Sequence, residues 1–114
     1  MPIDSVSQYR RWFEYERDSH AKVIAALRTA PPEIQSSAAF QKAVDLLAHV
    51  AAARLLWLYR FGTRPERPKD LFPANADLEQ IAADLETMQA EWTRFLEQAT
   101  EASIDRTFEY QAID

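Results

Sequence analysis

The stretch VDLLAHVAAARLLWLYRFG, Val44 to Gly62, is the most apolar run in the chain and decides the fold class. Its apolar residues recur at the spacing of one helix face. The main stripe comprises Phe40, Val44, Leu47, Ala51, Leu55 and Leu58. Leu46, Val50 and Trp57 widen the stripe on one flank. Such breadth predicts a central helix that contacts several neighbours.

Local signals mark both ends of this central helix. Ser36 or Ser37 can cap its first turn with a side-chain oxygen. Gly62 is placed to end it in the left-handed conformation, which glycine adopts readily. We therefore expect a helix from about Ser37 to Phe61.

Two further long helices are expected on either side of the central one. The first runs from about Ser5 to Thr29, starts with a Ser5–Gln8 capping-box spacing and stops before Pro31. Its apolar face comprises Val6, Tyr9, Phe13, Ile24 and Leu27. The last runs from about Leu78 to Glu101, with Asp77 as its cap. Its stripe comprises Leu78, Ile81, Leu85, Met88, Trp92, Phe95 or Leu96, and Ala99. The prediction is an all-α, up-down bundle of three long helices.

Two segments lie outside these helices. The link GTRPERPKDLFPANAD is locally basic through Arg60, Arg64, Arg67 and Lys69, which indicates a solvated loop or a landing site for a small anion. The tail RTFEYQAID alternates apolar and polar residues at Phe108, Tyr110 and Ala112, the period of a strand. We expect a short extended C-terminal segment there.

Composition excludes several classes of protein. The 114 residues suit a single domain, spanning 1–114, and the net charge of −5 argues against a nucleic-acid partner. The absence of cysteine excludes disulfides and thiolate chemistry and fits a reducing cytoplasm. No apolar signal-peptide core precedes the first helix, and no run approaches the ~20 apolar residues that span a membrane. With Gly62 as the one glycine there is neither a P-loop nor a dinucleotide fingerprint, and no HExxH is present.

Both histidines follow an acidic residue by four positions, as Glu16–His20 and Asp45–His49. Residues at this spacing share a helix face. One interpretation is a local hydrogen bond that satisfies a partly buried ring, and periodicity alone favours it. The other is a metal site, which needs three or four ligands. Two helices could offer His20, His49 and a carboxylate, but no spacing rule brings them together.

A family resemblance changes this balance. The segment HVAAARLLWLYRFG resembles the second-helix pattern of the DinB/YfiT-like superfamily of metal-dependent helical proteins, with His49, Ala52, Trp57, Leu58 and Gly62 in register. The segment YRRWFEYERDSHAKVIAAL resembles the Trp-rich opening helix of that family, where an Asn is common at the position of His20. FEYQAID is similar to the extended segment that precedes its last helix.

The resemblance implies a metal ligand at His49, a divalent ion such as Zn or Ni, and an activity like that of thiol-dependent transferases or isomerases. It also implies that Asp45 orients His49 through the ring nitrogen that does not bind the metal. His20 and Glu16 are expected near the cavity of the metal site. In such proteins the other ligands come from an H-x-x-x-H pair on a later helix. This sequence holds no such pair before Asp114, so His49 is expected to be one part of an incomplete site.

Without a fourth helix, three amphipathic helices are expected to leave an apolar groove open to water. Exposed apolar surface of that size is typical of an interface, so we expect a homodimer through this open face. Two hypotheses about function remain: a DinB-like metal-dependent enzyme, or a non-catalytic dimerisation or partner-binding module with structural histidines.

Overall fold

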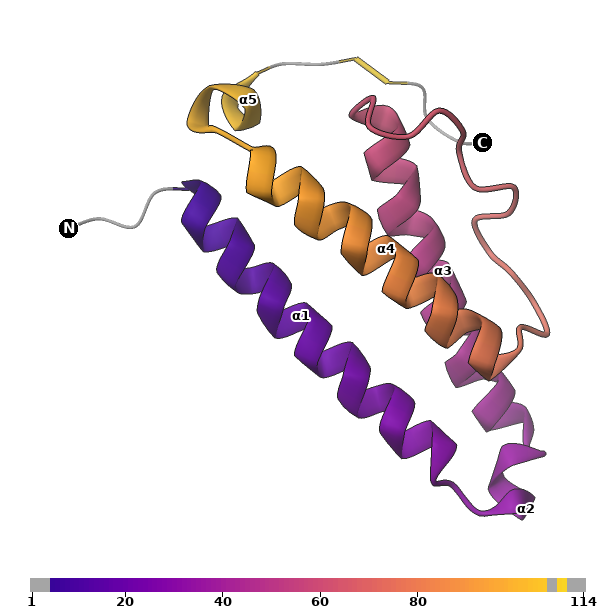
Figure 1. Cartoon of the computed structure of the whole chain (residues 1–114). Coiled ribbons are helices and arrows are strands. Elements are labelled where there is room, and N and C mark those ends of the chain that lie inside the picture. Colours follow the sequence, from indigo (N-terminus) through magenta and orange to yellow (C-terminus); the bar gives the residue numbers. More distant parts are fainter. Residues whose placement is uncertain (1–4, 107–108, 111–114) are drawn as a thin grey trace.

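The computed structural model describes residues 5–106 and 109–110, and the regular secondary structure in that part of the chain is all α-helix. The helices are α1 (Ser5–Arg28), α2 (Pro32–Gln35), α3 (Ala38–Arg60), α4 (Leu78–Gln98) and α5 (Glu101–Asp105) (Figure 1). The three long helices confirm the predicted fold class. No helix in the described ranges has the length and apolar character needed to cross a membrane.

Helix α4 packs against both α1 and α3, whereas α1 and α3 make little direct contact (Figure 1). Arg10 of α1 donates from Nε to the Leu96 carbonyl at the far end of α4, at 2.8 Å, so α1 and α4 are antiparallel. Trp92 of α4 donates to the Arg54 carbonyl of α3, at 3.0 Å. The connection 61–77 returns along α3, so α3 and α4 run in the same direction. Along the chain, α1 runs in one direction and α3 and α4 both run in the other. The three helices therefore do not alternate in direction, as the predicted up-down bundle would.

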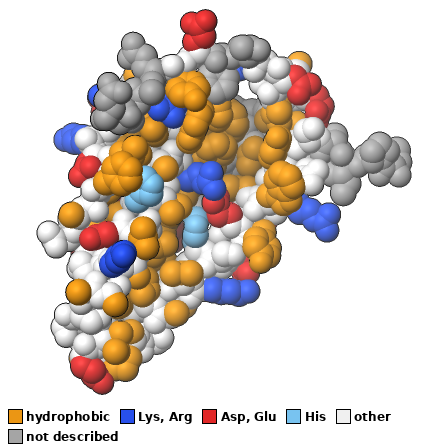
Figure 2. All heavy atoms as spheres, turned by 180° about the vertical axis from the view of Figure 1, so that it is seen from behind, with side chains coloured by type: hydrophobic (Ala, Val, Ile, Leu, Met, Phe, Trp, Pro, Cys, Tyr) orange, Lys and Arg blue, Asp and Glu red, His pale blue; other side chains and the backbone are white. Residues whose placement is uncertain are grey.

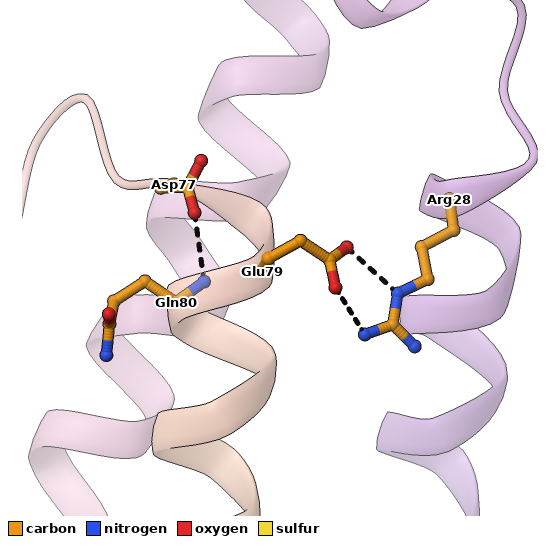
Figure 3. Close-up of polar contacts among 4 residues, drawn as sticks. All are labelled: Arg28, Asp77, Glu79 and Gln80. Atoms are coloured by element: carbon orange, nitrogen blue, oxygen red, sulfur yellow. Dashed lines mark hydrogen bonds and ion pairs between the residues drawn. The ribbon is translucent and has the colours of Figure 1, made fainter.

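The start of α4 is fixed by two contacts (Figure 3). Asp77 accepts a hydrogen bond from the Gln80 amide at 3.0 Å, as the predicted cap should. Glu79 forms a two-point ion pair with Arg28 at the end of α1, at 2.7 and 3.0 Å. The hydrogen bond from Arg28 lowers the pKa of Glu79 below its ordinary value. Both side chains are exposed, so the pair sets register more than stability.

The other predicted helix ends are also as the sequence indicates. Ser37 accepts from the Phe40 amide at 3.2 Å and caps α3. Gly62 follows the end of α3 with a φ of +86°, the left-handed region. The core lies between the three long helices, and its most enclosed side chains are Val44, Leu58 and Met88.

Two short helices depart from the sequence prediction. The segment after Pro31, expected as a break, makes the single turn α2, because proline is tolerated at the first helical position. The last long helix was expected to reach Glu101 but ends at Gln98. Ala99 is extended, and Thr100 and Ser103 then form a capping box that starts α5.

The predicted extended tail is covered only in part. Phe108 and Ala112 lie outside the described residues, whereas Tyr110 has no regular secondary structure and contacts Trp57 edge-to-face, with ring centroids 5.1 Å apart. The Arg60 guanidinium lies 4.3 Å from the centre of the Tyr110 ring and 4.7 Å from that of Trp57. These contacts hold Tyr110 against the end of α3.

Candidate functional site

His49 is positioned by the loop that follows its own helix. Its Nδ1 lies 2.7 Å from the carbonyl oxygen of Leu71. The imidazole stacks on the ring of Phe72, with centroids 4.4 Å apart and planes 10° from parallel. The loop therefore fixes both the position and the plane of the half-buried ring.

This geometry selects one tautomer of His49. A carbonyl oxygen only accepts hydrogen bonds, so Nδ1 must carry the proton and donate it to Leu71. In the neutral ring, Nε2 then holds the free lone pair. A backbone carbonyl on one nitrogen is the arrangement that commonly orients a histidine whose other nitrogen binds a metal.

Asp45, expected to orient His49, is bound to the end of the loop instead. Its Oδ1 accepts from the Ala76 amide and from Gln41 Nε2, each at 2.9 Å, and its Oδ2 accepts from the Asn75 amide at 3.3 Å. These hydrogen bonds, that of Ala76 first, lower the pKa of the Asp45 carboxyl. The described contacts include none between Asp45 and His49. The role that the resemblance implied for Asp45 falls to the Leu71 carbonyl.

Glu16 and His20 do not bind each other either. The Glu16 carboxylate pairs with Arg54 across the gap between α1 and α3. His20 Nδ1 is buried and has no hydrogen-bond partner among the described residues. The predicted Glu16–His20 hydrogen bond is therefore replaced by an ion pair between helices.

The donor set does not fit a complete metal site. Nowhere in residues 5–106 and 109–110 do three or more His, Cys, Asp or Glu side chains gather so that they could hold an ion. Structural and catalytic zinc sites use at least three protein ligands. Within the described chain, His49 offers one.

A second feature, separate from His49, is a pocket at the α5 end of the gap between α1 and α3. It is a half-open pocket of about 500 Å³ whose walls come from α1, α3, α4 and α5. Its aromatic lining comprises Tyr9, Trp12, Phe13, Phe61, Trp92 and Phe95. Its charged lining comprises Glu16, Arg54 and Arg106. Figure 2 shows hydrophobic side chains gathered on this face of the molecule, with both histidines visible among them.

An apolar groove was expected from the sequence, but the contribution of α5 to one end of it was not. Ile104 and Arg106 reach the pocket because α5 turns back across the bundle end. Glu101 accepts from the Val6 amide at 3.0 Å and attaches α5 to the first turn of α1. The Thr100–Ser103 spacing, typical of a capping box, was the available signal.

The basic loop after Gly62 is partly engaged in internal contacts. Arg64 donates from Nε to Glu91 at 2.9 Å, and both side chains are mostly buried. Arg60 lies against Trp57 and Tyr110. Arg64 and Arg60 are therefore engaged within the chain, which the expectation of a solvated loop did not include.

Comparison with known proteins gives a family match. The DinB family model matches residues 2–112. No curated protein and no solved structure matches the chain.

Proposed function

This chain belongs to the DinB family, and from that premise we propose that it is a helical module whose open α1–α3 face binds a second copy of itself. The proposal rests on one observation above all. Helices α1 and α3 each pack on α4 but hardly on each other, so within the described residues no helix covers the side of the bundle between them. Four-helix bundles close their core with all four members.

The dimensions of the molecule support this proposal. The Cα radius of gyration is 16.1 Å, whereas a compact domain of this length has about 13 Å. The principal extents of 51 × 37 × 18 Å describe a slab rather than a sphere. A slab of amphipathic helices reaches ordinary burial when a second layer covers it.

Exposed apolar side chains flank the gap. Trp12 and Val23 of α1 are 56% and 43% exposed, and Leu46 of α3 is 56% exposed. At 100° per residue, Leu46 lies about 80° around α3 from the pocket residue Arg54. These side chains therefore extend the apolar pocket into a longer strip, as an interface requires.

A homodimer predicts twice the chain mass of 13.1 kDa in size-exclusion chromatography with light scattering. Leu46→Glu places a charge in the strip and is expected to give the single-chain mass. Tyr59→Glu is the matched control, since Tyr59 is 40% exposed and lies about 140° around α3 from Leu46. A wild-type mass of one chain at ~100 µM, well above a micromolar Kd, contradicts the proposal.

The second candidate function is metal binding through His49 Nε2, and the observation that favours it is the hydrogen bond of Nδ1 to Leu71. In DinB-like enzymes a divalent ion such as Zn or Ni would serve thiol-dependent transfer or isomerisation. Because the described residues supply one ligand, the other donors would have to come from outside them.

The metal content of the purified chain and of two histidine variants tests this second candidate. Near-stoichiometric Zn or Ni in the purified chain, lost in His49→Ala and kept in His20→Ala, supports the metal site. Absence of bound metal, with both variants changing only the stability of the fold, supports structural roles for both histidines.

A further inference from the structure

The pocket at the α5 end of the α1–α3 gap has the size of a small-molecule site. Its volume is about 500 Å³, and ligand pockets in proteins range over roughly 300–1,000 Å³. It does not include His49, so it is separate from the candidate metal ligand. It lies within one chain, so its existence does not require the proposed dimer.

Aromatic rings fix one wall of this pocket. Phe61 and Phe95 are stacked, with centroids 5.2 Å apart, and Trp92 meets both rings edge-on at 6.1 and 5.4 Å. The Trp92 N–H is committed to the Arg54 carbonyl, so Trp92 offers only its ring to a ligand. A rigid wall of three rings favours a flat aromatic body, because ring pairs gain energy beyond the area they bury.

The charges at the pocket favour an anion. Arg54 is neutralised by Glu16. Arg106 donates from Nη2 to the Phe61 carbonyl at 3.2 Å, a neutral acceptor, and has no acidic partner in the described part of the chain. The lining therefore carries one positive charge in excess beside the aromatic wall. A guanidinium with spare N–H donors is suited to a carboxylate.

We propose that this pocket binds a small aromatic carboxylate, with its ring against Phe61, Trp92 and Phe95 and its carboxylate on Arg106. The body of the ligand replaces water over the apolar wall. The carboxylate uses the N–H groups of Arg106 that the Phe61 carbonyl leaves open.

The test is calorimetric titration of the full chain with 2-naphthylacetate and with its neutral isostere 2-naphthylacetamide. The acid is expected to saturate one site per chain and to bind about tenfold more tightly than the amide, the value of one charge-assisted hydrogen bond. Decanoate is expected to bind more weakly than 2-naphthylacetate, because an alkyl chain cannot stack.

Matched variants locate the contact. Arg106→Gln is expected to abolish the preference for the acid and to leave amide binding unchanged, whereas Arg67→Gln, which removes an exposed loop arginine, changes neither. Ile104→Trp fills the pocket and is expected to weaken both ligands, with far-UV circular dichroism reporting that the fold is kept. Leu46→Glu, which is expected to be a monomer, should bind the acid at least as tightly as wild type, because a second copy on the strip would compete for the pocket. Binding in this variant therefore tests the pocket independently of the dimer proposal.

Three results overturn the inference. One is the absence of saturable binding of either compound at ~1 mM, the weakest affinity expected of a specific small-molecule site. Another is equal affinity for acid and amide in the wild-type chain. The third is tighter binding of decanoate than of 2-naphthylacetate, which would indicate an unselective apolar surface.

Discussion

At the scale of single residues, the loop 61–77 decides what the side chains of α3 do. Asp45 and His49 share a helix face, and from spacing alone they were expected to bind each other. Instead Asp45 accepts from Asn75 and Ala76, and His49 donates to Leu71. Helical periodicity reports neighbours on one helix, and it does not report a loop that folds back over them. Spacing therefore could not predict that the Leu71 carbonyl, and not Asp45, binds the His49 ring.

Asp45 makes stability depend on pH. Its pKa is lowered in the folded chain by the loop amides. Its contribution is therefore fully present above the unfolded pKa of about 3.9 and is lost as pH falls through the lower folded pKa. Urea unfolding of Asp45→Asn is expected to show a stability deficit against wild type near neutral pH, and this deficit shrinks at acid pH. Asp18→Asn is the control for the loss of one exposed carboxylate. A deficit that stays constant down to acid pH would contradict the assigned role.

Gly62 is the second residue whose backbone matters. Its φ of +86° disfavours any side chain, although an added Cβ would meet nothing within 4 Å. Gly62→Ala is therefore expected to cost about 1 kcal/mol through backbone strain alone. Gly62→Asn should cost less, because Asn tolerates this region better. Urea midpoints measure both changes, and an alanine variant as stable as wild type would refute the strain.

At the scale of elements, long helices were predictable and short ones were not. The apolar stripes of α1, α3 and α4 extend over several turns and end at capping residues such as Ser37 and Asp77. The five residues of α5 are too few to show a period. The parallel course of α3 and α4 was likewise missed, because periodicity is the same for a helix running either way.

Helix α5 is expected to depend on its capping box. Thr100→Ala removes the acceptor of the Ser103 amide, a loss worth about 1 kcal/mol for a typical cap. Since α5 is attached to α1 through the contact of Glu101 with Val6, its loosening should also open the end of the pocket. Hydrogen exchange of residues 101–105 is expected to accelerate, while Thr87→Ala on the exposed side of α4 leaves it unchanged. Equal exchange in both variants would show that α5 is held by other contacts.

At the scale of the whole molecule, the open face connects shape with assembly. A chain that buries apolar surface between two copies gains stability from association, so its unfolding temperature rises with protein concentration. A single-layer monomer has no such dependence. Measuring the unfolding temperature at several protein concentrations therefore tests whether a second copy covers the open face, and the contact residues need not be known.

The expected size of this effect follows from mass action. Raising the protein concentration about 100-fold stabilises a dissociating dimer by about 2.7 kcal/mol, which should raise its Tm by about 5 °C or more. Differential scanning calorimetry at two such concentrations measures the shift. Leu46→Glu should abolish the shift, and Tyr59→Glu, on another side of α3, should retain it. If the wild-type Tm is independent of concentration, the open face is not covered by a second copy and the proposed homodimer is wrong, whereas binding of an aromatic carboxylate in the pocket would stand on its own titration.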